Sequence, residues 1–185
     1  MNSKYFLLIL LIMLLVGCGN SPQIFESDLG LVIAEEGELP SGFSEKYTLD
    51  VAPPIYINLP LPLSQRELYV QLQRNGILAE GIAIFFYDTK EDAEYAFQVL
   101  VDGLYTHSQD YERYATVLNS GEVGEKAITQ LWNSSTTEYK MLSTDVAFLR
   151  CRTVVDIGMA DINDLESVMT YAKKLDYRIK NQFCP

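Results

Sequence analysis

Histidine, cysteine and basic residues are scarce in this sequence. Its 185 residues include one histidine (His107), three cysteines, and 14 lysines and arginines against 25 aspartates and glutamates. A single histidine without a Cys-x-x-Cys pair disfavours a zinc site and leaves His107 as the one candidate base for a nucleophilic catalytic set. The formal net charge of −11 argues against nucleic acid as a partner. It also predicts that the protein body stands off an anionic membrane.

Known catalytic and phosphate-binding motifs are also missing. The sequence has no G-x-S-x-G, P-loop or G-x-G-x-x-G pattern, and the glycines of GEVGEK, residues 121–126, have the wrong spacing to hold a phosphate. His107 follows a predicted helix end, where an exposed histidine beside helix carbonyls is expected. Carboxylates are abundant, but no spacing distinguishes a catalytic pair. We therefore predict no catalytic residues, no metal site and no cofactor.

The stretch DINDLE, residues 161–166, resembles the start of a calcium-binding loop, with Asp161 and Asn163 in the first and third positions. Leu165 occupies the fifth position and the sixth lacks glycine, which excludes an EF-hand. Asn163 and Glu166 instead have the spacing of a capping box. We therefore predict that a helix begins near Asn163.

The N-terminal residues have the order of parts found in a secretory signal peptide. A short, positively charged start is followed by an apolar run over residues 5–16. Twelve helical residues rise about 18 Å, which is too short for a permanent span of about 30 Å of hydrocarbon. The sequence Leu15-Val16-Gly17-Cys18 resembles the lipobox of bacterial lipoproteins. In that family cleavage falls before the cysteine, whose thiol carries a diacylglycerol and whose new N-terminus is usually acylated.

This resemblance implies a location and a division of the chain. Residues 1–17 are predicted to be a lipoprotein signal peptide, residues 18–28 a short tether, and residues 29–185 a single domain. Acyl chains on Cys18 would anchor the protein to a bacterial cell membrane, with the domain facing the periplasm or the cell exterior. The alternative is an ordinary signal peptide that happens to end near a cysteine.

Two cysteines, Cys151 and Cys184, lie in the predicted exported domain. In an oxidising compartment such a pair is more often a disulfide than two free thiols. The runs DVAFLR and TVVDIGM indicate two strands around a hairpin tip at Cys151 and Arg152. A helix over about residues 164–180, packed antiparallel to the second strand, would return Cys184 to that tip. We predict a Cys151–Cys184 disulfide, with a buried Cys151 and a loose Cys184 as the alternative.

One segment admits two interpretations. The apolar residues of Leu68–Leu72 alternate with the period of a strand and precede an Asn-Gly pair at residues 75–76, which is the strongest short hairpin signal. The alternative is a helix that begins at Ser64, uses Glu67 in a capping box and ends at the glycine. The alternation favours the hairpin.

The remaining patterns predict a mixed fold. A stripe of apolar residues after a Thr89 N-cap predicts one helix, and a similar stripe after residue 163 predicts a second. Further short strands are predicted in YERYATVL, AITQLWN and EYKMLST. Four prolines in VAPPIYINLPLPL, residues 51–63, predict an extended segment over a sheet edge, or alternatively a polyproline face for a partner. The expected fold is α+β, a single antiparallel sheet with two helices packed on one face.

Four stretches together resemble a loose pattern in uncharacterised bacterial lipoproteins: LPSGF, FYDTKEDAEYAF, GEVGEKA and AKKLDYRI. The resemblance covers most of residues 39–180 and implies a secreted α+β domain with no catalytic residues to transfer. Our leading hypothesis is a membrane-anchored, non-catalytic interaction or accessory domain with an envelope protein or a cell-wall partner. The alternatives are a small-ligand or lipid carrier, suggested by the apolar runs GIAIFF and VAFL, and a carboxylate-based hydrolase.

Overall fold

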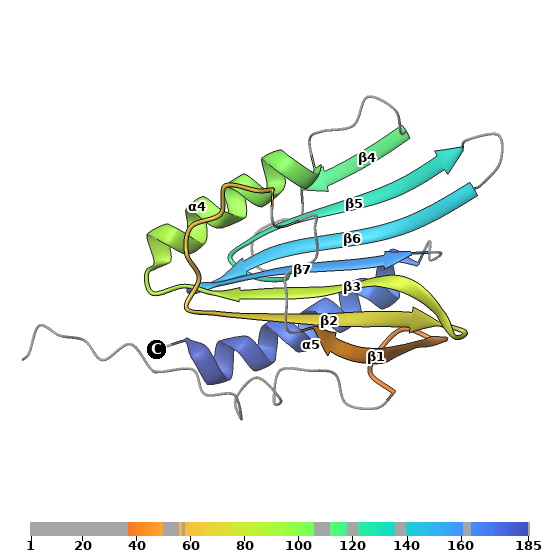
Figure 1. Ribbon diagram of the computed structural model, residues 1–185, viewed down its shortest axis with the longest axis horizontal. Helices are drawn as coiled ribbons and strands as arrows, with labels where there is room; N and C mark the ends of the chain where they lie inside the picture. The colour runs from red at the N-terminus through yellow and green to blue at the C-terminus, as the bar shows by residue number, and fades with distance from the viewer. Residues whose placement is uncertain are drawn as a thin grey trace, which may run out of the picture.

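An antiparallel sheet forms the centre of the protein (Figure 1). The structure is a computed structural model that describes residues 37–49, 56, 58–105, 112–117, 122–135, 140–160 and 164–184. Within these residues the sheet has seven strands in the order β1-β2-β3-β7-β6-β5-β4. The strands are β1 (Phe43–Leu49), β2 (Arg66–Arg74), β3 (Ile77–Phe86), β4 (Glu112–Val117), β5 (Lys126–Ser135), β6 (Lys140–Arg150) and β7 (Thr153–Ala160). Every neighbouring pair is antiparallel, which confirms the predicted sheet.

Two α-helices are described beside the sheet, so the predicted α+β class is confirmed. Helix α4 (Lys90–Leu100) follows β3 and continues into a π-helical turn at Val101–Tyr105. Helix α5 (Leu165–Phe183) follows β7. Both helices carry the apolar stripe that the sequence predicted, because their buried positions recur every three or four residues.

The two helix starts differ in how well the sequence predicted them. Thr89 caps α4 as expected, since its hydroxyl oxygen accepts a hydrogen bond from the N–H of Asp92 at 3.0 Å. Helix α5 is capped by Asp164, whose carboxylate accepts the N–H of Ser167 at 3.0 Å, so the predicted cap at Asn163 is wrong. Hydrogen bonds from the Ser167 hydroxyl, and then from its N–H, lower the pKa of Asp164. Adjacent Asn and Asp are both good caps, and sequence alone does not rank them.

The β2–β3 hairpin confirms the preferred interpretation of residues 66–86, and the helical alternative is wrong. Asn75 and Gly76 form the turn with φ of 51° and 83°, the left-handed values that a type I′ turn requires. The flanking residues Arg74 and Ile77 pair across the strands.

Replacing Asn75 by valine is expected to destabilise the domain by about 1–2 kcal/mol, because a β-branched residue resists positive φ. Asn75→Gly is the matched control and should leave stability nearly unchanged, since glycine adopts this conformation freely. Urea unfolding of the three proteins measures the difference. Equal midpoints for the valine and glycine variants would show that the turn does not hold the conformation described.

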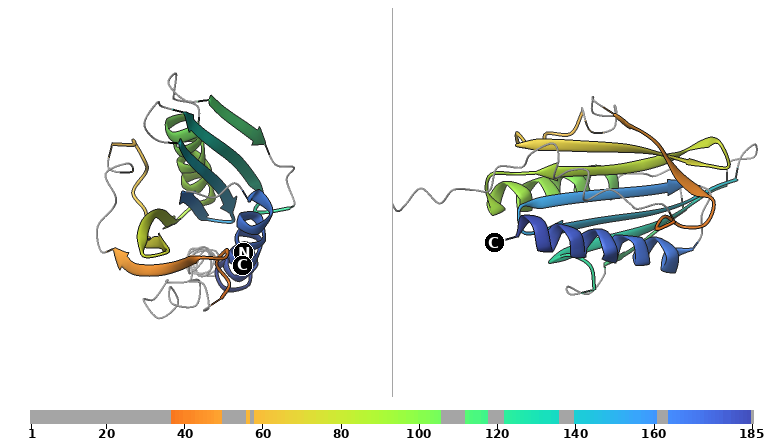
Figure 2. Two further views of the ribbon diagram at one scale, coloured as in Figure 1. Left: turned by 90° about the vertical axis from the view of Figure 1, so that its right-hand side faces the viewer. Right: turned by 90° about the horizontal axis from the view of Figure 1, so that it is seen from below.

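The helices lie on opposite faces of the sheet, so the prediction that both pack on one face is wrong. Alternate residues of β3 separate into two cores: Ile84 packs in the core that contains α5, and Phe85 packs in the core that contains α4. Successive side chains of a strand point to opposite faces, so both faces of β3 are covered. Figure 2 (left) shows the sheet end-on between the two helices. The unbroken apolar run GIAIFF is typical of such a doubly covered strand.

The two helices cover unequal shares of their faces. Helix α5 has 19 residues and spans about 28 Å, whereas α4 has 11 residues and spans about 16 Å. Strands of ten or eleven residues, such as β5 and β6, extend about 33 Å. Helix α5 therefore runs most of the length of the sheet, while α4 covers about half of the opposite face.

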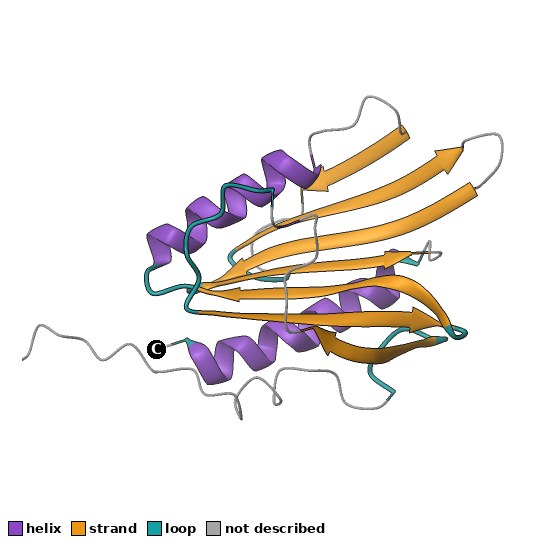
Figure 3. Cartoon of the chain, viewed as in Figure 1, coloured by secondary structure: helices purple, strands orange, loops and turns teal. Residues whose placement is uncertain are grey.

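Part of the proline-rich segment packs on the same face as α4. Tyr56 and Leu61 pack against the core of α4, and Leu59 lies against Gly103 just after that helix. Figure 3 shows the loop of residues 58–65, in teal, crossing α4. The described part of this segment thus covers a sheet face, and the prediction that it wraps a sheet edge is wrong. A short helix leaves apolar strand residues exposed, and this loop buries them.

Strand β6 is longer than predicted. The runs EYKMLST and DVAFLR are predicted as separate strands, yet Lys140–Arg150 is one continuous strand that pairs with β5 from Lys140 to Leu149. Ser143 and Thr144 have the composition of a turn, but both are buried within the sheet. Pairing with neighbours on both sides decides the conformation here over local propensity.

Candidate functional site

The two domain cysteines form the predicted disulfide. Cys151 lies at the tip of the β6–β7 hairpin, and Cys184 follows the last residue of α5. Their Cα atoms are 5.8 Å apart across a sequence separation of 33. Helix α5 packs back along β7, which is the geometry that the sequence predicted. The disulfide joins the end of α5 to the sheet and has a structural role.

A largely buried ion pair lies beside this disulfide. Arg150 donates two hydrogen bonds of 2.6 Å to the two carboxylate oxygens of Asp176 on α5. The same carboxylate accepts the N–H of Gly124 at 3.0 Å, which brings the loop before β5 into the cluster. The hydrogen bonds to Asp176 raise the pKa of the Arg150 guanidinium. Three segments distant in sequence are therefore fixed by one carboxylate.

Glu125 extends this cluster toward α4. Its carboxylate accepts the N–H of Cys151 at 3.0 Å and pairs with Lys90 at 2.6 Å. The hydrogen bond from Lys90, with that from Cys151, lowers the pKa of Glu125. A carboxylate with a lowered pKa contributes stability above its unfolded value of about 4.5, and this contribution is lost as the pH falls through the folded pKa. The GEVGEKA loop therefore has a structural role.

A polar layer lies on the α4 face of the sheet. Tyr56 donates a hydrogen bond of 2.9 Å to Asp156 of β7, and Ser143 donates one of 2.9 Å to Asp145 of β6. The register pairs Asp145 with Gly158, so the two carboxylates occupy diagonal positions on neighbouring strands. Burial, and then the charge of Asp156, raise the pKa of Tyr56, which keeps its hydroxyl a proton donor.

Aromatic rings cover this layer. Tyr56, Tyr69 and Phe85 pack with ring centroids 5.4 to 5.8 Å apart. Tyr69 donates to Glu67 at 2.8 Å, and burial raises its pKa as well. The hydrolase hypothesis requires two neighbouring carboxylates, which the sequence did not identify. Asp145 and Asp156 are such a pair. Asp156 is buried and Asp145 is partly buried, and both accept hydroxyl hydrogen bonds within a packed layer, as structural carboxylates do.

Two exposed aliphatic residues follow each other at the start of β3, just after the β2–β3 turn. Ile77 is 73% exposed and Leu78 is 50% exposed. Gly42 lies beside the same turn, because Asn75 donates its N–H to the carbonyl of Gly42 at 3.3 Å. We call Ile77 and Leu78 the apolar tip. Because both are exposed at one end of the hairpin, the apolar tip is a candidate interaction surface.

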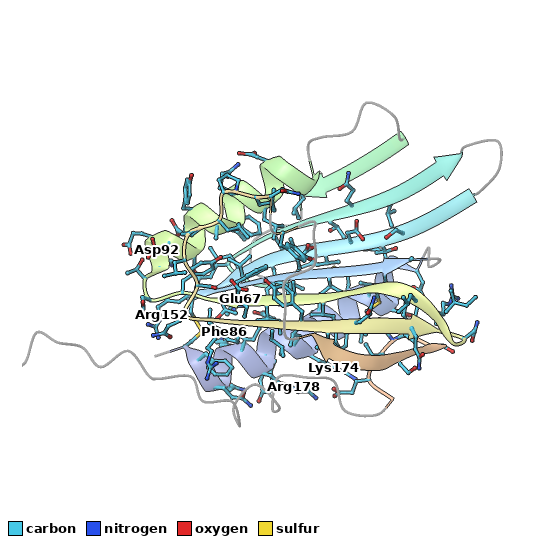
Figure 4. All side chains as sticks on the ribbon, viewed as in Figure 1. Glu67, Phe86, Asp92, Arg152, Lys174 and Arg178 are labelled. Carbon is cyan, nitrogen blue, oxygen red and sulfur yellow. A yellow bond between two sulfur atoms is a disulfide. The ribbon has the colours of Figure 1, made fainter. Side chains whose placement is uncertain are left out.

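A shallow depression of about 540 Å³ lies on the outer side of α5. Six residues line it: Glu38, Thr170, Lys173, Lys174, Tyr177 and Arg178. Figure 4 shows Lys174 and Arg178 on α5, beside the start of the described chain. We call this depression the basic groove. The net charge of the whole chain gives no sign of this groove, whereas the charges of the α5 sequence alone would indicate it.

Several sequence predictions fall outside the described residues. These are Cys18 with its lipobox, the signal peptide, the whole tether over residues 18–28, His107 and Asp161. Across the described ranges no three His, Cys, Asp or Glu side chains gather closely enough to hold a metal ion. No helix in that part of the chain is long and apolar enough to span a membrane. GIAIFF and VAFL are core strands, which accounts for the runs that suggested a carrier.

Comparison with known proteins finds a structural likeness and no relative in sequence. No family model matches the chain, and no curated protein matches its sequence. Among solved structures, the chain is similar to the extracellular domain of PknH from Mycobacterium tuberculosis, with a TM-score of 0.59 and 14% sequence identity. The match covers 87% of this chain and 100% of that domain. At this identity the likeness shows a shared fold.

Proposed function

We propose that this chain is a membrane-anchored envelope lipoprotein whose domain acts as a non-catalytic interaction module outside the cytoplasm. The observation that carries the interaction role is the apolar tip, where Ile77 and Leu78 remain exposed although most large apolar side chains of the described structure are buried. Successive side chains of a strand point to opposite faces, so a partner that encloses this end of the hairpin would remove both side chains from water, which favours binding.

The setting of the proposal has separate support. The lipobox at Leu15-Val16-Gly17-Cys18 supports a lipid anchor, and the Cys151–Cys184 disulfide is typical of oxidising compartments. The structurally similar protein is an extracellular domain, which supports the same side of the membrane for this chain. We propose an envelope protein, or a protein of the cell wall, as the partner.

Affinity isolation of the acylated protein from detergent-solubilised membranes tests this function. The wild-type chain should recover a defined partner. The I77S/L78S variant should recover at least about 10-fold less of that partner, because each aliphatic side chain contributes about 1.5–3 kcal/mol when fully buried. Leu63→Ser is the matched control, since Leu63 is a single aliphatic residue that is 95% exposed. Partner recovery that is absent, or unchanged in I77S/L78S, would contradict the proposed interaction.

The anchor has its own readout. Mass spectrometry of the same membrane fraction should find a mature chain that starts at an acylated Cys18. Cys18→Ser should leave an uncleaved or mislocalised precursor, because the acyl acceptor is lost. An unmodified N-terminus at another residue would contradict the anchor, whatever the result with the apolar tip.

A further inference from the structure

The basic groove is a local exception in an acidic protein. Three of its six lining side chains, Lys173, Lys174 and Arg178, are cationic, in a chain with a net charge of −11. The lysine side chains are 51% and 47% exposed, so their ammonium groups reach solvent. The acidic surface that predicts repulsion from a membrane is therefore interrupted along the outer side of α5.

The acidic neighbours of the groove only partly offset this charge. Glu38 pairs with Arg178 and lies 4.0 Å from Lys174, while Glu122 lies 4.0 Å from Lys173. Both 4.0 Å pairs are long and their lysine side chains are about half exposed, and such pairs contribute little binding energy. Both lysines thus remain able to approach another anion without breaking a strong interaction.

Tyr177 adds an amphipathic side chain to the same surface. It lies in the groove with 68% of its surface exposed. A tyrosine combines an apolar ring with a polar hydroxyl, and such residues are enriched where proteins meet the boundary between lipid and water. Lysines beside an exposed tyrosine match the chemistry of a phospholipid headgroup layer.

The groove also lies where the membrane tether joins the domain. Glu38 is a lining residue, and it follows Cys18 by twenty residues in the sequence. Twenty residues reach at most about 70 Å when fully extended. Because Glu38 is bound to α5 through Arg178, any chain that runs from an anchored Cys18 enters the domain beside the groove.

We propose that the basic groove of α5 binds the phosphate groups of anionic lipids in the membrane that carries the Cys18 anchor. This proposal rests on the anchor in the proposed function. Lys173 and Lys174 face the lipid phosphates, and the Tyr177 ring enters the headgroup layer. The groove sets which side of the domain faces the membrane, and the opposite, α4 side faces away from it.

Amine labelling of the full, acylated protein in lipid vesicles tests the orientation. The protein is reconstituted into vesicles of equal parts phosphatidylglycerol and phosphatidylcholine, or of phosphatidylcholine alone, and treated with a water-soluble acetylating reagent. Mass spectrometry then gives the labelling rate of each lysine. We expect Lys173 and Lys174 to react about fivefold more slowly with the anionic lipid, the factor that attraction of one basic residue to an anionic surface provides.

Lys126 is the matched control. Its side chain is 51% exposed, as is that of Lys173, but it pairs with Glu94 of α4 on the other side of the sheet. Its labelling rate should be the same in both vesicles. Equal rates for Lys173 in the two vesicles, or equal slowing of Lys126, would overturn the proposal.

The experiment separates the groove from the anchor on which it depends. Cys18 acylation is verified in the same sample, so absent protection with an acylated Cys18 contradicts the lipid proposal alone. Protection of Lys173 in native membranes but not in anionic vesicles would assign the groove to an acidic protein and likewise overturn it. Lys180 is exposed on α5 at helical spacing from Lys173 and should also be labelled more slowly with the anionic lipid, and the double variant K173Q/K174Q should abolish that slowing.

Discussion

Asp176→Ala should lower the free energy of unfolding by about 3–5 kcal/mol, because it leaves a largely buried arginine without its anion. The side chains of Arg150 and Asp176 are only 17% and 10% exposed, and they are joined by two hydrogen bonds of 2.6 Å. The alanine variant also removes the acceptor of the Gly124 N–H. Urea unfolding monitored by circular dichroism measures the loss.

Two further variants show whether the buried charge is the cause. The double variant R150M/D176L removes both charges and should be more stable than Asp176→Ala, since no unpaired charge remains. Glu94→Ala breaks the exposed pair with Lys126 and should cost less than about 1 kcal/mol. If Asp176→Ala proves as mild as Glu94→Ala, the cluster beside the disulfide does not hold the three segments together.

Replacing both disulfide cysteines by serine is expected to cost about 3–4 kcal/mol. Cys151 and Cys184 close a loop with a sequence separation of 33, and opening it returns conformational freedom to the unfolded chain. Serine keeps the Cys151 N–H that donates to Glu125, so the hairpin tip retains its local hydrogen bond. Thermal unfolding of the wild type with and without reductant, beside the C151S/C184S variant, measures the effect.

The comparison has an internal check. Reduced wild type and the double serine variant should unfold together, well below the oxidised protein. A double variant within about 1 kcal/mol of the oxidised protein would mean that α5 is held to the sheet by packing and by Asp176 alone.

Local patterns predicted the elements of this fold well. The Asn75-Gly76 turn, the Thr89 cap and the return of Cys184 to Cys151 each depend on short-range geometry or on simple lengths of helix and strand. Turn chemistry and caps act within a few residues, so one sequence contains the whole signal.

The arrangement in three dimensions was harder to predict. The sequence pattern of each helix shows an apolar stripe, but it does not show which face of the sheet that stripe packs against. In the structure Ile84 faces α5 and Phe85 faces α4, on opposite faces of the same strand. An unbroken apolar strand favours cover on both faces, and that signal in GIAIFF was missed.

The candidate surfaces depend on contacts between distant parts of the chain. The polar layer joins Tyr56 to Asp156 across 100 residues, and the basic groove joins Glu38 to Arg178 across 140. The apolar tip was present in the sequence as Ile77 and Leu78, but only the structure shows that the two side chains stay exposed. The exposure of a side chain depends on the whole folded chain, so a local sequence pattern indicates it only indirectly.

The disulfide also determines how the domain responds to mechanical load. If the protein is held at its N-terminal side and a partner binds the domain, tension passes through β1, which among the described strands pairs only with β2. Tension applied there separates strands one hydrogen bond at a time. The disulfide closes the segment from Cys151 to Cys184 into a covalent ring. Force therefore cannot pull this segment out to the roughly 110 Å that it would span as an extended chain. Tension that enters through β1 therefore reaches a core of β7 and α5 that stays closed after the edge has opened.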